Sequence, residues 1–262
     1  ACGGTSPEWA SATLLGRHHV RYHRCAACGL IQTQTPYWLD EAYATAITTS
    51  DIGLVGRNLT QADATEAVIL GLCDPTQRFL DYGGGYGMFV RLMRDRGFQF
   101  FRQDPLCQNL FAAQFDASLD DVGGYELITA FEVLEHLVTP LEVLEQLLRA
   151  GKAVLCSTRL VPTPTPAPDA WWYFGLEHGQ HVTLYTRASL NSLARRLNAH
   201  VVSDNRSLHL FSRTPVSETW FRALRVAGRF VPGIVRTTFG WRKPVRSLLG
   251  PDYERLTGLR LT

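Results

Sequence analysis

A glycine-rich turn in the first half of the chain has the composition of a ligand-binding loop. The run DYGGGYG, from Asp81 to Gly87, follows an apolar strand pattern and precedes a helical one. Glycines at 83, 85 and 87 let the backbone turn sharply and approach a ligand closely. The third glycine comes one place too early for the dinucleotide pattern GxGxxG, which argues against a nicotinamide oxidoreductase. No GK[ST] follows, which excludes a phosphate-binding P-loop.

One carboxylate and three histidines after the glycine-rich turn are further candidates for ligand binding or catalysis. Asp104 ends the next strand pattern, 23 residues after Asp81, where a carboxylate accepts hydrogen bonds from ribose hydroxyls. His136, His178 and His181 are candidate general bases, because imidazole has a pKa close to working pH. We favour His181, which follows a proline- and aromatic-rich segment on the expected substrate side. A structural hydrogen bond is the alternative role for each histidine.

Three cysteines near the N-terminus have the pattern of a metal-binding knuckle. Cys25 and Cys28 form a CxxC followed by glycine, and Cys2 lies in ACGG. Four thiolates on two such turns bind zinc tetrahedrally. The fourth ligand would precede Ala1, if the sequence begins inside the first knuckle, or would be a histidine: His18, His19 or His23. A metal-free CxxC in a loop is the alternative, and the remaining cysteines are expected to be buried thiols: Cys73, Cys107 and Cys156.

Strand and helix patterns alternate from residue 78 onward. We predict strands at 78–82, 98–103, 125–130, 152–157, 199–203 and 207–212. Helices are predicted at 87–96, 105–114, 139–149 and 187–198, after an earlier helix start at Asp40 and a helix at 61–72. Such alternation predicts an α/β fold, a Rossmann-like, doubly wound, mostly parallel sheet with helices on both faces. Ligands of such sheets bind at the carboxyl ends of the strands.

The domain organisation follows from these patterns and from the charge distribution. With 26 basic and 24 acidic residues among 262, the net charge is +2, which excludes a uniformly polyelectrolyte protein. Residues 213–262 contain ten Lys or Arg and three acidic residues, so the charge of this tail is +7. We predict a small β-rich, zinc-ribbon-like segment at 1–40 and a helical lead-in at 41–76. A Rossmann-like domain at 77–212 contains a substrate lid at 159–186, and a basic helical extension follows at 213–262.

Together, four motifs resemble the class I S-adenosylmethionine-dependent methyltransferases, and specifically the branch that methylates small molecules. They are the turn DYGGGYG, Asp104 in RQDP, the run FEVLEHL at 131–137, and WWYFGLEHGQHVTLYT at 171–186. The resemblance covers roughly residues 60 to 212. Related enzymes sometimes carry an N-terminal zinc ribbon, which fits residues 1–40.

The resemblance implies a role for each residue of the cofactor site. The glycines at 83, 85 and 87 would pass close to the methionine part of S-adenosylmethionine, with Asp81 bracing the turn and Asp104 holding the ribose. The aromatic rings of Tyr86 and Phe131 would stabilise the sulfonium by cation–π contact. Phe115 and Asp116 would lie next to the adenine, and Phe131 and Glu132 would border the cofactor where the strand at 125–130 ends. Glu132 and Glu135 are alternatively carboxylates at the start of a helix.

The expected function is methyl transfer to a small molecule or sugar-type acceptor, to oxygen with a histidine base. A methyltransferase of nucleic acid or protein is the first alternative, suggested by the ribbon and the basic tail. The predicted strand at 125–130 leads into FEVLEH rather than into an Asn/Asp-Pro-Pro-aromatic tetrapeptide, so we expect no nucleic-acid partner. A non-catalytic zinc scaffold is the second alternative. We find no secretion signal or membrane span, and so expect a cytoplasmic enzyme whose tail meets an anionic acceptor, a partner chain or a membrane surface.

Overall fold

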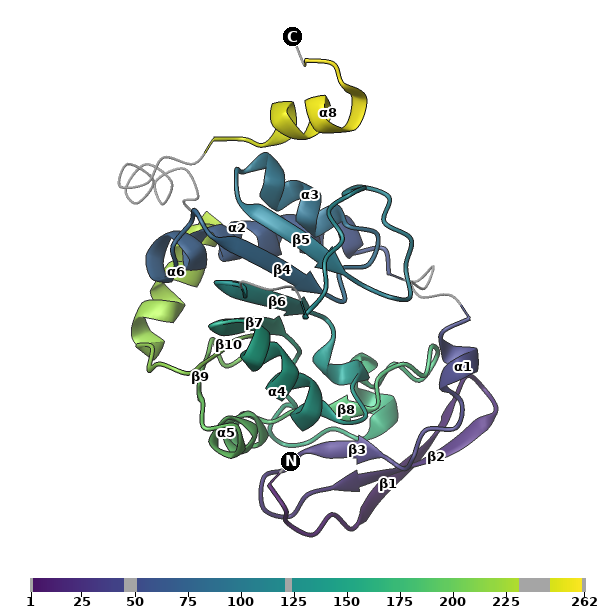
Figure 1. Ribbon diagram of the computed structural model, residues 1–262. Coiled ribbons are helices and arrows are strands. Elements are labelled where there is room, and N and C mark those ends of the chain that lie inside the picture. The colour runs from purple at the N-terminus through teal and green to yellow at the C-terminus, as the bar shows by residue number, and fades with distance from the viewer. Residues whose placement is uncertain (1, 45–50, 121–123, 231–245, 261–262) are drawn as a thin grey trace.

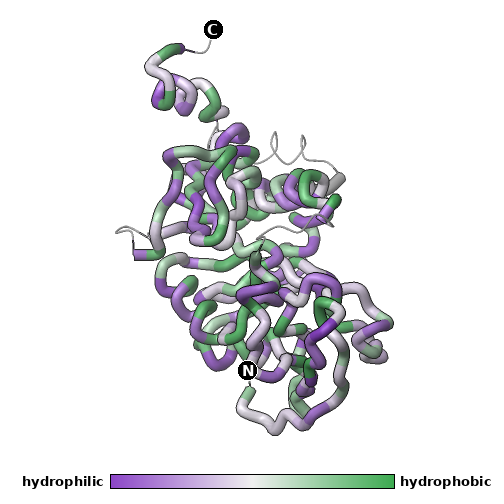
Figure 2. The backbone as a smooth tube through the Cα atoms, turned by 90° about the vertical axis from the view of Figure 1, so that its right-hand side faces the viewer, coloured by the Kyte–Doolittle hydropathy of each residue, from purple (hydrophilic) through white to green (hydrophobic). Residues whose placement is uncertain are grey.

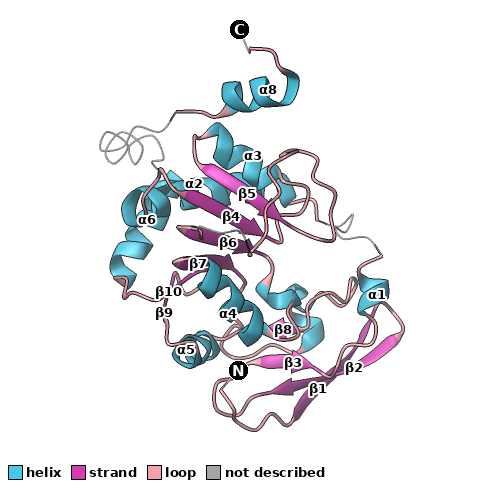
Figure 3. Ribbon diagram, viewed as in Figure 1, coloured by secondary structure: helices cyan, strands magenta, loops and turns pink. Residues whose placement is uncertain are grey.

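The strand patterns of residues 78–212 form one central sheet, visible in Figures 1 and 3. The computed structural model describes residues 2–44, 51–120, 124–230 and 246–260. The spatial order of the strands is β5-β4-β6-β7-β10-β9. In chain order they are β4 (Arg78–Tyr82), β5 (Gln99–Gln103), β6 (Leu127–Phe131), β7 (Ala153–Ser157), β9 (His200–Ser203) and β10 (Leu208–Ser212).

Strand directions determine which strand ends meet at one edge of the sheet. Strands β5, β4, β6 and β7 are parallel, whereas β10 pairs antiparallel with both β7 and β9. The register places Asp81 opposite Arg102 on one side and Thr129 on the other. The carboxyl ends of four strands therefore meet at one edge. The predicted mostly parallel sheet is confirmed.

Two hydrophobic layers cover the sheet because successive residues of each strand point to opposite faces. On one face, Phe79 belongs to a core with α2 (Leu54–Leu72), α3 (Met88–Asp95) and α6 (Glu218–Phe230). On the other face, Leu80 packs in a second core with α4 (Pro140–Ala150) and α5 (Arg187–Arg196). Figure 3 shows these helices in cyan on both sides of the magenta strands.

The predicted helix at 105–114 is wrong, and this segment is a loop. Pro105 follows β5, and the carboxylate of Asp104 accepts the N–H groups of Leu106 (2.8 Å) and Cys107 (3.0 Å), which favours a turn over a helix. Asn109 holds the end of the loop by accepting the N–H of Ala112 (3.0 Å) and donating to its carbonyl (2.7 Å). These side-chain bonds replace the backbone bonds of the expected helix.

The N-terminal segment forms a second sheet together with a segment far along the chain. Its order is β1-β2-β3-β8, from strands β1 (Glu8–Leu14), β2 (His18–Arg24), β3 (Ile31–Thr33) and β8 (Thr183–Leu184). Strand β8 lies at the end of the predicted lid, and the lid's short 3-10 helices η2 (Pro168–Ala170) and η3 (Trp172–Phe174) lie nearby in sequence. Tyr22 and Ile31 pack against Tyr173 and Phe174 in a shared core. Residues 2–33 and the segment 159–186 are therefore one packed unit.

A short helix connects this unit to the central sheet. Helix α1 (Leu39–Ala42) begins near the predicted start at Asp40 but is only four residues long. The indole N–H of Trp38 donates to the carbonyl of Gly179 (2.8 Å), and Trp38 packs with Val182. The next helix, α2, begins at Leu54, earlier than the predicted residue 61.

The described part of the C-terminal tail is helical and docked. Helix α6 packs on α2 so closely that a Cβ at Gly228 would meet the carbonyl oxygen of Asp63 at 2.6 Å. Helix α8 (Leu249–Thr257) contacts α3 through Asp252, at the end of the molecule opposite the N-terminal sheet (Figures 1 and 2). Residues 231–245 of the tail lie outside the described residues. None of the helices in the described ranges combines the length and apolar character needed to cross a bilayer.

Candidate active site

The glycine turn leaves the carboxyl end of β4 and leads into α3. Gly83, Gly85 and Gly87 have φ of +69°, +53° and +85°, a left-handed backbone that favours glycine. Asp81, which is 3% exposed, accepts the hydroxyl of Thr129 from β6 (2.6 Å). Burial raises the pKa of Asp81 to about 7. The carboxylate of Asp81 therefore ties β4 to β6 directly before the turn.

Side chains at three glycines of the turn would meet close neighbours. A Cβ at Gly83 would lie 2.7 Å from Cγ2 of Val133, and one at Gly87 would lie 2.5 Å from Oδ1 of Asn109. At Gly84 it would lie 2.7 Å from the carboxylate of Asp81. This close packing restricts the path of the backbone at the carboxyl end of β4.

Asp104 and Arg102 hold the turn from β5. Oδ2 of Asp104 accepts the N–H of Gly85 (2.8 Å). The guanidinium of Arg102, only 4% exposed, donates to the carbonyls of Gly85 and of Cys107 (3.0 Å), and its Nε donates to Asp116 (2.8 Å). Sequence reasoning identified Asp104 but missed Arg102; the one available signal was a charged residue inside an apolar strand pattern.

The predicted adenine neighbours differ in accessibility. Phe115 is 0% exposed, and the Arg94 guanidinium lies 3.5 Å from its ring centroid. Asp116 is exposed and makes an isolated parallel bridge with Arg102. The backbone carbonyl of Tyr86 accepts the N–H groups of the loop residues 110 and 111. Asp116 and the half-buried Tyr86 lie at the glycine-turn edge, whereas the ring of Phe115 belongs to the core.

The end of β6 contains a residue in an unusual conformation. Glu132 has φ of +52°, which is costly for a side chain other than glycine. Its N–H donates to Oγ of Ser157 at the end of β7 (2.9 Å), and the same hydroxyl donates to its carboxylate. Phe131 packs edge-on against Phe89, with centroids 5.0 Å apart. Ser157 thus holds the Glu132 backbone in a turn away from the strand.

The three predicted histidines converge just beyond this turn. The ring of His181 lies 4.9 Å from that of His136 and 4.8 Å from that of His178. Burial lowers the pKa of His136 to about 4 and that of His181 well below its ordinary value. The side chains come from the 3-10 helix η1 (Leu134–His136) and from the segment before β8, so only the fold brings them together.

Hydrogen bonds assign the tautomers of two of these imidazoles. Nδ1 of His181 lies 2.6 Å from the carbonyl of Tyr173, so it carries the proton and leaves Nε2 as an acceptor. Nδ1 of His178 accepts the N–H of Gln180 (3.1 Å), so its Nε2 carries the proton. Nδ1 of His136 lies 2.9 Å from the hydroxyl of Tyr43.

Glu135 is the buried acid of this cluster, and its burial was not foreseen from the sequence. It is 0% exposed, and its Oε1 accepts the hydroxyl of Tyr173 (2.7 Å). Burial, followed by the charge of Glu132, raises the pKa of Glu135 to about 8. Its position in FEVLEH was visible in the sequence, but Tyr43 and Tyr173 gave no sequence signal of their approach.

A comparison with protein families identifies the family of the chain. A family described as methyltransferase domain matches residues 57–204, more than half of the chain and most of the central sheet. The chain belongs to the methyltransferase domain family. The predicted methyltransferase family and the mostly parallel sheet with helices on both faces are thereby confirmed.

Several solved structures are similar to this methyltransferase. The crystal structure of TnmH is 19% identical, with 68% of this chain and 62% of that chain covered and a TM-score of 0.49. The S-adenosylhomocysteine-bound CalO1, a methyltransferase in calicheamicin biosynthesis, is 16% identical, with 68% and 60% covered and a TM-score of 0.43. A putative methyltransferase of Haloferax volcanii in complex with the activator Trm112 is 16% identical, with 70% and 100% covered and a TM-score of 0.47.

The similarity covers only part of the length of the first two of these proteins. The methyltransferase spans about three fifths of the length of TnmH and CalO1. No curated protein matches its sequence.

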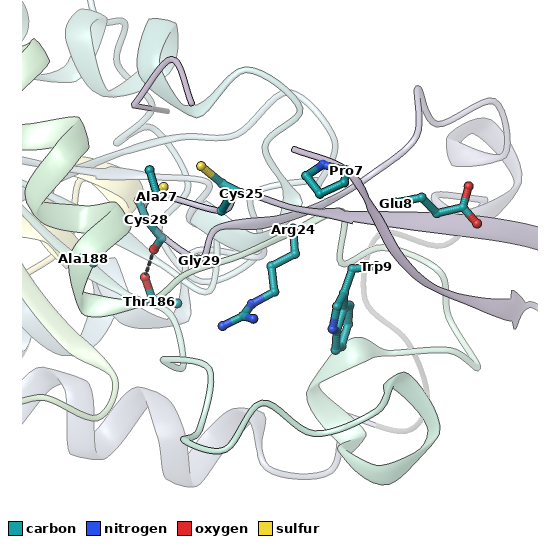
Figure 4. A pocket seen from close by; sticks show the side chains of 11 residues that line it. Pro7, Glu8, Trp9, Arg24, Cys25, Ala27, Cys28, Gly29, Thr186 and Ala188 are labelled. Atoms are coloured by element: carbon teal, nitrogen blue, oxygen red, sulfur yellow. Dashed lines mark hydrogen bonds between the residues drawn. The ribbon is translucent and has the colours of Figure 1, made fainter. Parts of the chain in front are cut away.

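The predicted zinc ligands of the methyltransferase also come together. The sulfur atoms of Cys2, Cys25 and Cys28 all lie within 4.8 Å of one another, and those of Cys2 and Cys25 are 3.3 Å apart. Burial opposes ionisation of Cys25, but hydrogen bonds from Cys28, Cys2 and Ala27 lower its pKa to about 6. Figure 4 shows Cys25 and Cys28, with the hydroxyl of Thr186 donating to the Cys28 carbonyl (2.5 Å).

The three candidate histidines for a fourth ligand lie in different surroundings. His23 lines a cavity of about 180 Å³ together with Cys2 and Cys25. Nε2 of His18 instead pairs with Glu41 (3.0 Å), and His19 is exposed on β2. A larger cavity of about 530 Å³, lined by Trp9, Arg24 and the CxxC turn, lies beside the cluster (Figure 4).

Proposed function

We propose that this methyltransferase transfers a methyl group from S-adenosylmethionine to a hydroxyl oxygen of a small-molecule acceptor. The observation that carries the proposal is the juxtaposition of two features along one strand edge. The glycine turn with Asp104 lies at the ends of β4 and β5, and β6 runs through Glu132 directly into η1 with His136. A cofactor held by the turn and by Asp104 would lie at the same strand edge from which β6 leads into η1. Small-molecule acceptors, anionic or sugar-linked ones included, are the class we expect.

The cofactor would be held by groups already fixed in position. Asp104 offers carboxylate oxygens to ribose hydroxyls, Tyr86 and Phe131 offer aromatic rings, and Asp116 and Glu132 border the same edge. Bound S-adenosylmethionine supplies an electrophilic methyl group on a sulfonium. Positioning of acceptor and methyl group accounts for much of the rate of such reactions.

His181 is our candidate for the group that takes the acceptor proton. Its Nδ1 lies 2.6 Å from the Tyr173 carbonyl and donates its proton there, which leaves Nε2 as an acceptor. His178 has the opposite tautomer and would act as a donor through Nε2. His136, paired with the Tyr43 hydroxyl, would orient the acceptor or His181. These roles support an oxygen acceptor, because a hydroxyl needs a base to become a good nucleophile.

Replacing Asp104 tests the cofactor site. Asp104→Ala should weaken binding of S-adenosylhomocysteine by about 10- to 100-fold, as expected for lost hydrogen bonds to a charged group. Titration calorimetry measures the change, with the exposed Asp120→Ala as the control. Methyl transfer from labelled S-adenosylmethionine to a panel of hydroxylated small molecules then tests the activity. Equal affinity for both variants would reject the ribose role, and no binding by the unmodified chain would reject the function.

We also propose that Cys2, Cys25 and Cys28 bind a structural zinc ion. Three convergent sulfurs fit zinc, whose structural sites are thiolate-rich and four-coordinate. His23 lines a cavity together with Cys2 and Cys25, and we propose it as the fourth ligand. Zinc bound here would hold the β2–β3 turn against Thr186 at the start of α5.

The zinc proposal predicts a coupled loss of metal and stability. Cys28→Ser should lose one equivalent of zinc per chain and should lower the melting temperature, because metal-binding free energy adds to folding free energy. Elemental analysis and thermal unfolding measure both effects. Cys107→Ser, outside the cluster, is the matched control and should retain both. Full zinc content in Cys28→Ser would contradict the proposal.

A further inference from the structure

The acidic and imidazole groups beside the glycine turn form a second cluster that could bind a metal ion. Each of Glu135, His136 and His181 offers one ligand atom, and these three atoms all lie within 4.8 Å of one another. We propose that Glu135, His136 and His181 bind a divalent cation that holds the acceptor oxygen during methyl transfer. The inference rests on the proposed function and specifies how the acceptor is bound.

The first support is a buried carboxylate oxygen that lacks a partner. Oε1 of Glu135 accepts the Tyr173 hydroxyl, but Oε2 has no hydrogen-bond partner among the described residues, and the residue is 0% exposed. A buried carboxylate oxygen without a partner is costly, so native structures pair such atoms or use them to bind ions. The histidines beside it offer nitrogen ligands at the same point.

The second support is that neighbouring groups orient the ligands. Tyr173 contacts two of them, donating its hydroxyl to Glu135 and accepting the Nδ1–H of His181 at its carbonyl. Metal-binding histidines commonly donate one N–H to a carbonyl so that the other nitrogen faces the metal. The imidazole of His136 is held by the Tyr43 hydroxyl at Nδ1 (2.9 Å) and by a hydrogen bond with the backbone of Gln180.

The donor set indicates the class of ion. Two imidazoles and one carboxylate suit a divalent ion of the first transition series, such as manganese, iron or zinc, and leave coordination positions open. This set differs from the sulfur cluster near the N-terminus, which selects soft ions. Glu132, whose charge acts on Glu135, adds negative potential next to the site.

A cation here would change how the acceptor proton is lost. A hydroxyl bound to a divalent cation has a lowered pKa, so its O–H bond breaks with the proton passing to water. The oxygen then forms a bond to the methyl carbon while the carbon–sulfur bond breaks and leaves its electron pair on sulfur. The products are the methyl ether, S-adenosylhomocysteine and a released proton. His181 would act as a ligand in the loaded enzyme and as a base only without the ion.

Manganese binding to the full chain tests the proposal. We expect the unmodified chain to bind one Mn²⁺ at this site, measured from the loss of the free-ion signal in electron paramagnetic resonance. Glu135→Gln and His181→Ala should each weaken this binding about tenfold or more, since even outer-shell changes cost that much. The exposed Glu142→Gln and His200→Ala are matched controls and should bind Mn²⁺ as the unmodified chain does.

The outcomes separate this proposal from the proposed function. No Mn²⁺ binding by the unmodified chain, or equal binding by Glu135→Gln, would overturn the metal site. Retention of S-adenosylhomocysteine binding shows that a variant is folded; if Glu135→Gln fails this check, His136→Asn takes its place. Full methyl transfer in the presence of a chelator would overturn the metal role while leaving the methyltransferase function intact. Absent cofactor binding would instead reject that function, whatever the Mn²⁺ result.

Discussion

Replacing His181 by alanine is expected to lower turnover on a hydroxyl acceptor by about 10²- to 10⁴-fold, the usual contribution of a positioned acid–base group. Affinity for S-adenosylhomocysteine should hardly change, because the glycine turn and Asp104 do not contact the imidazole through any described hydrogen bond. Initial rates with saturating S-adenosylmethionine, together with calorimetry, measure the two quantities separately.

The control for this experiment is His200→Ala, which removes an exposed imidazole from β9 and should leave both quantities unchanged. Added free imidazole distinguishes the two roles open to His181. If the residue is the base, imidazole should restore part of the turnover of His181→Ala; if it is a ligand, the variant should also lose Mn²⁺. Unchanged turnover in His181→Ala would reject both roles.

The parts of the fold that the sequence predicted well are those determined by local pattern. Strand β4 was predicted at its observed bounds, because RFLDY has an aromatic and aliphatic centre and is followed by the glycine turn. The glycine turn was predicted for a similar reason: positive φ at 83, 85 and 87 is a property of single residues. Asp104 followed from its place at the end of a strand.

The parts that were missed depend on contacts between distant segments. The helix expected at 105–114 gave way to side-chain bonds of Asp104 and Asn109 that a periodicity analysis does not weigh. No pattern in β1 to β3 indicates that their fourth neighbour is β8, some 150 residues later. The burial of Glu135 and its bond to Tyr173 likewise exist only once η1 and η3 are packed together.

The docking of the C-terminal helix illustrates the same point and carries the second large expected effect. The Arg94 guanidinium, on α3, is buried and donates to both carboxylate oxygens of Asp252 on α8, at 2.7 and 2.6 Å. Its remaining nitrogen donates to the carbonyl of Phe100 (3.0 Å), and Arg91 adds a second contact to Asp252 (2.9 Å). A tail that is basic overall is thus anchored by one of its few acids.

Asp252→Ala should therefore destabilise the protein by about 3–5 kcal/mol, because it leaves the Arg94 charge buried without its counter-ion. Urea unfolding measures this loss. Glu254→Ala on the same helix is the control: its partner Arg260 is exposed, so its loss should cost less than about 1 kcal/mol. Arg94→Met combined with Asp252→Leu should recover most of the stability, since both charges are then absent. Equal costs for Asp252→Ala and Glu254→Ala would contradict the anchor.

Asp252→Ala should also affect the glycine turn that we propose to bind the cofactor. Arg94 covers the ring of Phe115, the residue before Asp116, and α3 begins directly after Gly87 of the glycine turn. If α8 leaves α3, the Arg94 side chain loses the partner that fixes it over Phe115. We therefore expect Asp252→Ala to weaken S-adenosylhomocysteine binding as well as stability, whereas Glu254→Ala should change neither. Weaker cofactor binding in the first variant alone would show that the tail supports the methyl-donor site through α3, and unchanged binding in both would confine the role of α8 to stability.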